Sequence, residues 1–439
     1  MRHAFFNLAS FIGTQLRETE QFTAWLSGED SDFVRFNHAR VRQAGHVQQA
    51  FLTLRLIRGQ RHVSAQMSLT GESVGDRTLV AEQLPILRAQ LLDVAEDPHL
   101  LWSQEALEAT STHESVPLDA AAIAAEIVEA ALGYDLVGYL ASGQMYTGFA
   151  SSTGSRMWHQ TASFNLNWSL YAQADKAVKC AYAGHTWNSS LFREKMQNAA
   201  RELRLLNLPP RTLEPGEYRA FLTPTALAEV LGMLNWGGLS EKQLRVKRSP
   251  LLKLHSREAQ FSPLLYLTEN TADGLSPQFQ PDGFQKPGQV PLIDQGQAVG
   301  TLIAPRTAME YGLQPNSDSA ESTETLHVRG GTLRESEILQ ALGTGLYVSN
   351  LWYLNFSDRM NARVTGMTRF ATFWVENGEI VAPVNVMRFD DSLFRMLGDQ
   401  LEALTLEREL LVDNDTYGSR HTTSLLLPGA LLRSLRLVL

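Results

Sequence analysis

A serine between two glycines is the clearest arrangement of residue types that could do chemistry. The run Gly71-Glu72-Ser73-Val74-Gly75 has the pattern G-x-S-x-G, which in α/β-hydrolases holds a nucleophilic serine on a sharp strand-to-helix turn. An alternating segment precedes the run and a helically spaced segment follows it, so Ser73 is a candidate nucleophile of a serine hydrolase. The preceding segment is polar and alternating, unlike the buried parallel strand of such enzymes. We therefore favour a strand-to-helix connection in which Ser73 is structural, for example as a helix cap.

Other residue types that bind metals or attack substrates are sparse or unfavourably spaced. The chain has 11 histidines, and no two of them have the i, i+4 spacing that puts two imidazoles on one helical face. Cys180 is the only cysteine, which excludes an internal disulfide and any zinc site built on several cysteines. It lies in an alternating apolar run and is predicted to be a small core residue. Neither a phosphate-binding loop nor a dinucleotide-binding motif is found, so we expect no cofactor.

The elements that must position these residues belong to a folded chain of ordinary composition. Its 439 residues predict two or three domains. The net charge of −9 disfavours nucleic acid as the main partner, because phosphate attracts cations. No apolar run approaches the roughly 20 residues that span a bilayer. The first residues are not typical of a signal peptide. We expect a cytoplasmic protein without a membrane or nucleic-acid partner.

The first half of the chain groups its strands and its helices separately. Alternating segments predict strands at residues 32–41, 47–58 and 61–70, the last two joined as a hairpin through Gly59 and Gln60. Further strands are expected within residues 136–183. Helices are expected near the start of the chain and at residues 76–93, 119–132 and 190–206, with Asp119 as an N-cap. Such grouping is typical of an α+β fold with an antiparallel sheet.

A cluster of prolines near residue 210 marks the best domain boundary. We expect an N-terminal α+β domain over residues 1–210 and a mostly β domain over residues 211–439. Thr223 and Pro224 form a good helix start, which predicts a helix over residues 223–234. A second helix is expected over residues 392–404, and most of the remaining segments are short strands.

Three segments of the second half resemble the TldD/PmbA (TldE) family. They are residues 345–351 (GLYVSNL), 363–369 (RVTGMTR) and 373–384 (FWVENGEIVAPV). The last is the most specific, because it matches the family pattern F-x-[VI]-E-N-G followed by P-V. The order of an α+β half and a mostly β half matches the family too. The resemblance implies a peptidase system in which TldD-type chains hold zinc, and PmbA/TldE-type chains lack the ligands and pair with a TldD chain.

The resemblance also places the family's metal ligands in this sequence. In the helix that follows Thr223, Glu229 stands where the general base would be. Ala228 and Met233 stand where the two histidines would be, and Tyr417 stands where the late cysteine would be. Alanine has no donor atom and a thioether is a weak zinc ligand. The resemblance therefore implies a degenerate site with no bound metal and no catalytic residue.

These observations predict a PmbA/TldE-like, zinc-less subunit of a TldD/TldE-type peptidase complex that acts on peptides or unfolded proteins. Its partner would be a TldD-like zinc peptidase chain in a heterodimer, or a second copy in a homodimer. The apolar segment 347–356 (YVSNLWYLNF) is the candidate interface. Two alternatives remain, an active metallopeptidase with non-standard ligands and a serine hydrolase that uses Ser73.

Overall fold

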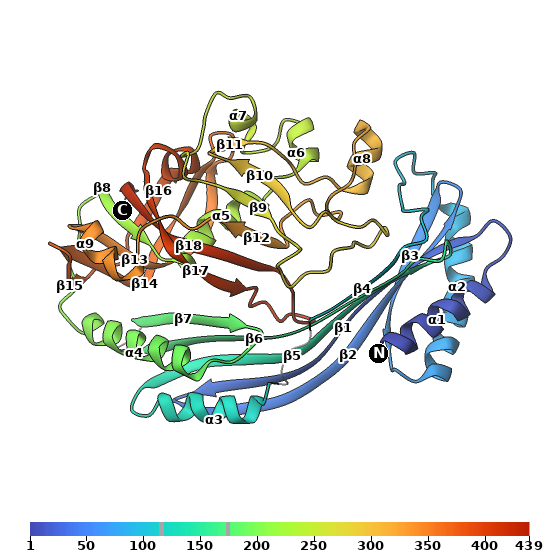
Figure 1. Ribbon diagram of the computed structural model, residues 1–439, viewed down its shortest axis with the longest axis horizontal. Helices are drawn as coiled ribbons and strands as arrows, with labels where there is room; N and C mark the ends of the chain where they lie inside the picture. The colour runs from blue at the N-terminus through green and yellow to red at the C-terminus, as the bar shows by residue number, and fades with distance from the viewer. Residues whose placement is uncertain (114–117, 173–175, 439) are drawn as a thin grey trace.

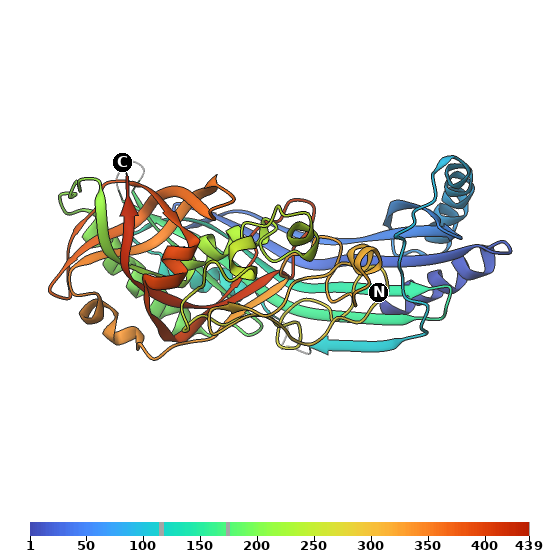
Figure 2. The same ribbon diagram turned by 90° about the horizontal axis from the view of Figure 1, so that it is seen from above.

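A computed structural model describes residues 1–113, 118–172 and 176–438. The fold is α+β, with a long curved sheet in the N-terminal part and a mostly β body in the C-terminal part (Figure 1). The C-terminal body lies over one end and the middle of the curved sheet, and the strands continue beyond it to the helices at the other end (Figure 2). No helix in these three stretches is both long and apolar enough to span a bilayer.

The N-terminal sheet has the order β3-β2-β1-β5-β6-β4, with β7 paired to β6. The pairs are antiparallel except that of β4 and β6. The expected hairpin through Gly59 and Gln60 is confirmed as the turn between β2 and β3. The expected strand at residues 32–41 is wrong as a single element, because His38 and Ala39 take positive φ and turn the chain from β1 into β2. The strands are β1 (Gln21–Asn37), β2 (Arg40–Arg58), β3 (Arg61–Leu69), β4 (Glu108–His113), β5 (Asp135–Ser151), β6 (Arg156–Tyr171) and β7 (Ala177–Gly184).

Four helices cover one face of this sheet, two at each end. Successive side chains of a strand point to opposite faces, and the even-numbered residues of β1 supply the helix-covered face. Near the start of β1, Phe22 and Leu26 share a core with α1 (Arg2–Gln15) and α2 (Ser73–Asp93). Near its end, Val34 and Phe36 share a core with α3 (Ala120–Ala130) and α4 (Ser189–Leu206). Asp119 caps α3 as expected, because its side chain accepts a hydrogen bond from the Ala122 N–H at 2.9 Å.

The C-terminal body is an eleven-stranded sheet with short helices. Its strand β8 pairs with both β13 and β18, so the path from β18 through β16, β14 and β13 closes on itself around an apolar core. The strands are β8 (Gly216–Leu222), β9 (Leu267–Glu269), β10 (Val290–Asp294), β11 (Gln297–Ala298), β12 (Thr325–Val328), β13 (Gly345–Asp358), β14 (Arg363–Glu376), β15 (Glu379–Pro383), β16 (Arg388–Ser392), β17 (Leu401–Val412) and β18 (Ser424–Leu437). The helices are α5 (Pro224–Gly232), α6 (Glu241–Arg245), α7 (Leu252–His255), α8 (Pro305–Tyr311) and α9 (Ile338–Leu342).

The helix expected over residues 392–404 forms only in its first part. Residues 393–399 are helical, with a π-helical turn at Arg395–Asp399 in which Gly398 takes non-helical angles (φ −103°, ψ −117°). The chain then enters β17, which pairs with β18. Pairing along β18 satisfies backbone groups that a short helix with a glycine near its end would leave exposed.

The two parts of the molecule share contacts along the second face of the N-terminal sheet. Ala181 of β7 packs against the core of the C-terminal body on this face. Beside β7, the edge strand, Ala371 and Phe373 of β14 are also buried in the helix-covered core that β6 and α4 form. Two loops of the C-terminal body, residues 270–289 and 413–423, contact the middle of the sheet. The curved sheet is therefore covered by helices at the ends of one face and by the C-terminal body on the other.

Ser73 lies at the start of α2, where the sequence suggested that it could cap the helix. Ser73 is exposed at the first position of the helix, and Glu72 at the N-cap makes no side-chain cap. The buried carboxylate of Asp76 instead holds the turn that leads into the helix: it accepts hydrogen bonds from Thr70 N–H at 2.8 Å, Thr70 O–H at 2.9 Å and Gly71 N–H at 3.1 Å. The expectation that Ser73 could cap the helix is therefore wrong, because Ser73 lies inside the first turn and the N-cap position is Glu72.

We expect Asp76→Ala to lower the free energy of unfolding by about 1–3 kcal/mol, because three buried or half-buried donors lose their acceptor. Ser73→Ala is the matched control at the same turn and should change it by less than about 0.5 kcal/mol. Urea unfolding followed by circular dichroism measures both. A larger loss for Ser73→Ala than for Asp76→Ala would contradict this assignment.

Candidate functional site

The helix α5 carries the positions that the resemblance assigns to the metal site. Thr223 caps it by accepting a hydrogen bond from Ala226 N–H at 3.2 Å, and Pro224 fills the first helical position. The Thr223 hydroxyl also donates to the carbonyl of Ser349 at 2.7 Å, which fixes the start of α5 against β13. The predicted helix start is therefore confirmed, and the apolar side of α5 is buried in the C-terminal core.

The two positions that the resemblance assigns to histidine ligands carry side chains that pack against the C-terminal core. Ala228 is half-buried and packs against the C-terminal core. Met233 begins the 3₁₀ turn Met233–Asn235 and is only 3 % exposed, so its thioether lies among apolar side chains. Both side chains serve packing.

Glu229, at the position of the general base, lies on the exposed side of α5. The surrounding protein removes part of its hydration and raises its pKa, while the cationic Lys179 of β7 lowers it. The Glu229 carboxylate is therefore close enough to Lys179 of the N-terminal sheet to interact with it electrostatically.

Tyr417 lies in the segment 413–423 that joins β17 to β18, and its side chain is 93 % exposed. Hydrogen bonds tie this segment to the N-terminal sheet. Asn165 donates to the carbonyls of Val412 and Asp413 at 3.2 and 3.1 Å, and Gln49 donates to the carbonyl of Gly418 at 2.7 Å. In the described residues, no hydrogen bond joins this segment to α5. The structure therefore shows no hydrogen-bonded link between Tyr417 and the positions of Ala228 and Met233.

The residues at the assigned positions do not fit a zinc ion. Ala228 offers no donor atom, and Met233 offers only a buried thioether. Within residues 1–113, 118–172 and 176–438, no three His, Cys, Asp or Glu side chains are grouped so that they could hold a metal ion. We therefore derive no chemical step through a metal in this chain.

A buried cation at the centre of the molecule was not anticipated from the sequence. Arg420, 8 % exposed, donates to the Ser31 hydroxyl at 3.3 Å, to the carbonyl of Gly143 at 3.4 Å, and to the carbonyl and hydroxyl of Ser163 at 3.0 and 2.8 Å. Burial lowers the pKa of Arg420 to about 10, and the buried carboxylate of Glu29 opposes this shift. The only sequence signal is a run of polar residues in the middle of otherwise apolar strands.

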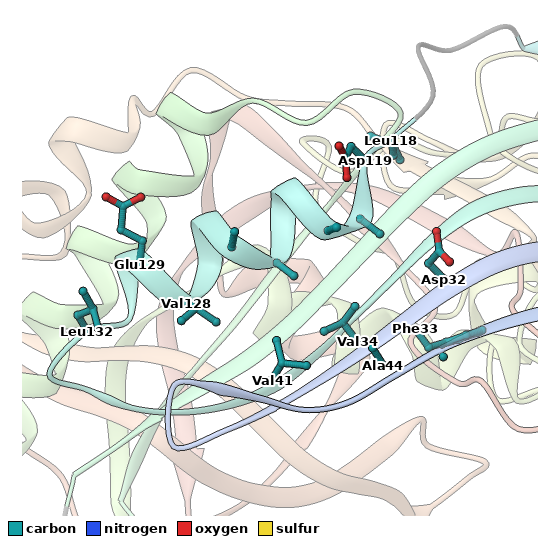
Figure 3. A pocket seen from close by; sticks show the side chains of 15 residues that line it. Asp32, Phe33, Val34, Val41, Ala44, Leu118, Asp119, Val128, Glu129 and Leu132 are labelled. Atoms are coloured by element: carbon teal, nitrogen blue, oxygen red, sulfur yellow. The ribbon is translucent and has the colours of Figure 1, made fainter.

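Two hollows of different character flank the N-terminal sheet. One, of about 340 Å³, lies between the two parts of the molecule where α4 and β7 approach β17 and the start of α5. The other, of about 980 Å³, is an apolar groove between α3 and the tip of the β1–β2 hairpin, on the helix-covered face (Figure 3). Val34, Val41 and Val128 point into the groove, and carboxylates lie only toward its rim. Only the first hollow adjoins α5.

Comparison with known proteins identifies relatives across the whole fold. The structure of TldE from Thermococcus kodakarensis matches with a TM-score of 0.78 and 14 % identity, covering 99 % of this chain and 100 % of that one. A proposed modulator of DNA gyrase from Thermotoga maritima matches with a TM-score of 0.75, 12 % identity and 99 % of both chains. A protein of the same description from Bacteroides thetaiotaomicron matches with a TM-score of 0.70 and 15 % identity, covering 99 % of this chain and 98 % of that one. At these identities the likeness shows a shared fold.

A search of curated proteins gave no match. The family model for the PmbA/TldA metallopeptidase C-terminal domain matches residues 215–437, which is just over half of the chain. This match covers α5, the motif-bearing strands β13 to β15 and the segment that contains Tyr417. The chain therefore belongs to the PmbA/TldD family of metallopeptidase-related proteins.

Proposed function

We propose that this chain is a non-catalytic, zinc-less subunit of a TldD/TldE-type peptidase complex that acts on peptides or unfolded proteins. One observation carries the proposal: at the two positions that would hold histidine ligands, one in α5 and one in the 3₁₀ turn after it, the chain has a half-buried alanine and a methionine packed into the core. Without a metal-bound water of lowered pKa, Glu229 has no nucleophile to activate. We assign Glu229 the role of a surface carboxylate facing Lys179.

The role left for the chain is to shape a peptide-handling space. We propose that residues 1–210 and 211–439 act as two domains that enclose this space between them. The change from one sheet to the other between β7 and β8 supports this division. Free sheet edges can hold extended peptides through main-chain hydrogen bonds, which tolerate many sequences.

A TldD-like zinc peptidase chain is the proposed partner, with a homodimer as the alternative assembly. We propose a cytoplasmic location, which the single cysteine supports because disulfides are common in oxidising compartments.

The candidate interface at residues 347–356 divides into two parts. Val348 and Leu351 are buried in β13, whereas Trp352 and Tyr353 are 38 % and 75 % exposed and lie 5.1 Å apart. This aromatic pair, with the exposed Asn355 beside it, could reach a partner.

The first test of the proposal concerns metal content. After dialysis against a weak chelator, the purified chain should hold no stoichiometric zinc, because its α5 supplies no ligand at either histidine position. Elemental analysis by mass spectrometry measures this, with a TldD-like chain carried through the same dialysis as the positive control. One tightly held zinc per chain would instead support an active metallopeptidase with non-standard ligands.

The second test concerns the partner. Alone, the chain should not cleave casein, and activity should appear when a TldD-like chain is added. With Trp352→Asp, the two chains should need at least about a tenfold higher concentration to co-elute, because a charge at the centre of an interface is unfavourable. The variant should stay folded, since Trp352 is exposed and the new carboxylate would lie beside Arg369, whose guanidinium is now 4.2 Å from the indole ring.

The matched control is Leu132→Asp, which changes another exposed apolar side chain on the opposite face of the N-terminal sheet. Size-exclusion chromatography of the mixed chains measures both variants. Normal co-elution of a folded Trp352→Asp chain would remove this surface from the interface. Casein cleavage by the chain alone would overturn the non-catalytic role.

A further inference from the structure

The hollow of about 340 Å³ between the two parts of the molecule is built like a binding site for an amphipathic side chain. Such a volume lies in the range of ligand pockets, roughly 300–1,000 Å³. The elements around it come from both halves of the chain: β7 and α4 on one side, and β17, α9 and the start of α5 on the other. In Figure 1 this place lies where β17 passes over β7.

One part of the cavity wall is apolar. Phe221 is 1 % exposed and stacks on Tyr347 with ring centroids 5.7 Å apart, and both line the cavity. Leu191 of α4, 40 % exposed, and Ile338 of α9 complete this wall at its sides. A surface of this kind suits the aliphatic stem of a long side chain.

The remaining wall carries an excess of negative charge. Four glutamates line the cavity, against two cations, Lys195 and Arg408; the glutamates are Glu194, Glu335, Glu407 and Glu409. Lys195 is already paired with Glu409, and Arg408 donates to the carbonyl of Val328 at 3.4 Å.

Two of these four carboxylates are not paired with a cationic side chain in the described residues. Glu194 and Glu335 form no ion pair with any residue that the structure describes. Partial burial and repulsion from Glu409 and Glu407 raise the pKa of Glu335, so the carboxylates are close enough to disfavour one another's charge. A cation placed among them would relieve this repulsion.

The free edge of β7 borders the same cavity. In the described part of the chain β7 pairs only with β6, and Tyr182 and Ala183 of β7 line the cavity. Unpaired backbone N–H and C=O groups at a sheet edge are a template for an added strand. An extended peptide paired there would direct alternate side chains toward the two walls.

We propose that this cavity binds a lysine or arginine side chain of an extended peptide that pairs with the edge of β7. The aliphatic stem lies against Phe221 and Tyr347, and the cationic head lies between Glu194 and Glu335. This inference rests on the peptide-handling role proposed above and adds a preference for basic peptides. It requires neither metal nor partner chain, so its failure would leave the zinc and co-elution tests standing.

Fluorescence anisotropy with labelled eight-residue peptides tests the inference on the full chain. A peptide with one central arginine should bind about tenfold more tightly at low salt than the same peptide with citrulline, its neutral isostere. The double variant Glu194→Gln/Glu335→Gln should reduce this preference to less than about threefold. Glu18→Gln/Glu82→Gln is the matched control, because it removes two exposed carboxylates near α1 and α2, away from the cavity, and should keep the preference.

Two further measurements separate the parts of the proposal. Leu191→Trp at the rim should weaken binding of both peptides, and its circular dichroism should match the parent chain. Peptides N-methylated at alternate residues lose main-chain donors and should bind at least about tenfold more weakly if they pair with β7. Equal affinity for arginine and citrulline peptides, or an unchanged preference in the cavity variant, would overturn the inference, and so would the absence of any peptide binding.

Discussion

The guanidinium of Arg420 donates hydrogen bonds to a buried polar strip in the middle of the N-terminal sheet. The middle strands of the N-terminal sheet carry Ser31, Ser163 and Glu29 on the face beneath the C-terminal loops. A buried polar group without a hydrogen bond costs about 1–3 kcal/mol, so this strip favours a donor-rich side chain above it. Arg420 reaches three strands at once from a loop of the other half. Together with the contacts of Arg55 and Asn165 to the same two loops, this contact holds the C-terminal body on the middle of the sheet.

The packing of α5 does not require metal ligands. The N-cap of α5 and its bond to β13 hold the helix in place whether or not it carries ligands. Met233 fills core volume that a histidine would fill only with a hydrogen-bond partner for its ring. Ala228 packs at the edge of the same core. A chain can therefore lose the ligands and keep the architecture, since the core and not the metal positions α5.

Local rules predicted the local features well. The Gly59 turn, the Asp119 cap and the start of α5 at Thr223 depend on a few neighbouring residues, and the structure confirms them. The helix expected at residues 392–404 ends early, at Asp399, because the residues that follow pair with β18, the next strand along the chain. The burial of Arg420 and the cavity between α4 and β17 could not be predicted, because both depend on segments about 200 or more residues apart. The family motifs predicted the family without any of this geometry, and the family model that matches residues 215–437 confirms it.

The single cysteine has a practical consequence for work on this chain. Cys180 lies on β7 beside Trp168, and burial raises the pKa of its thiol far above the ordinary value. Because the thiolate is the reactive form, alkylating reagents and disulfide exchange should reach Cys180 slowly at neutral pH. Thiol-reactive probes should therefore label an introduced, exposed cysteine much faster than Cys180. One cysteine introduced on each half would carry a fluorophore pair that reports how far the two halves separate.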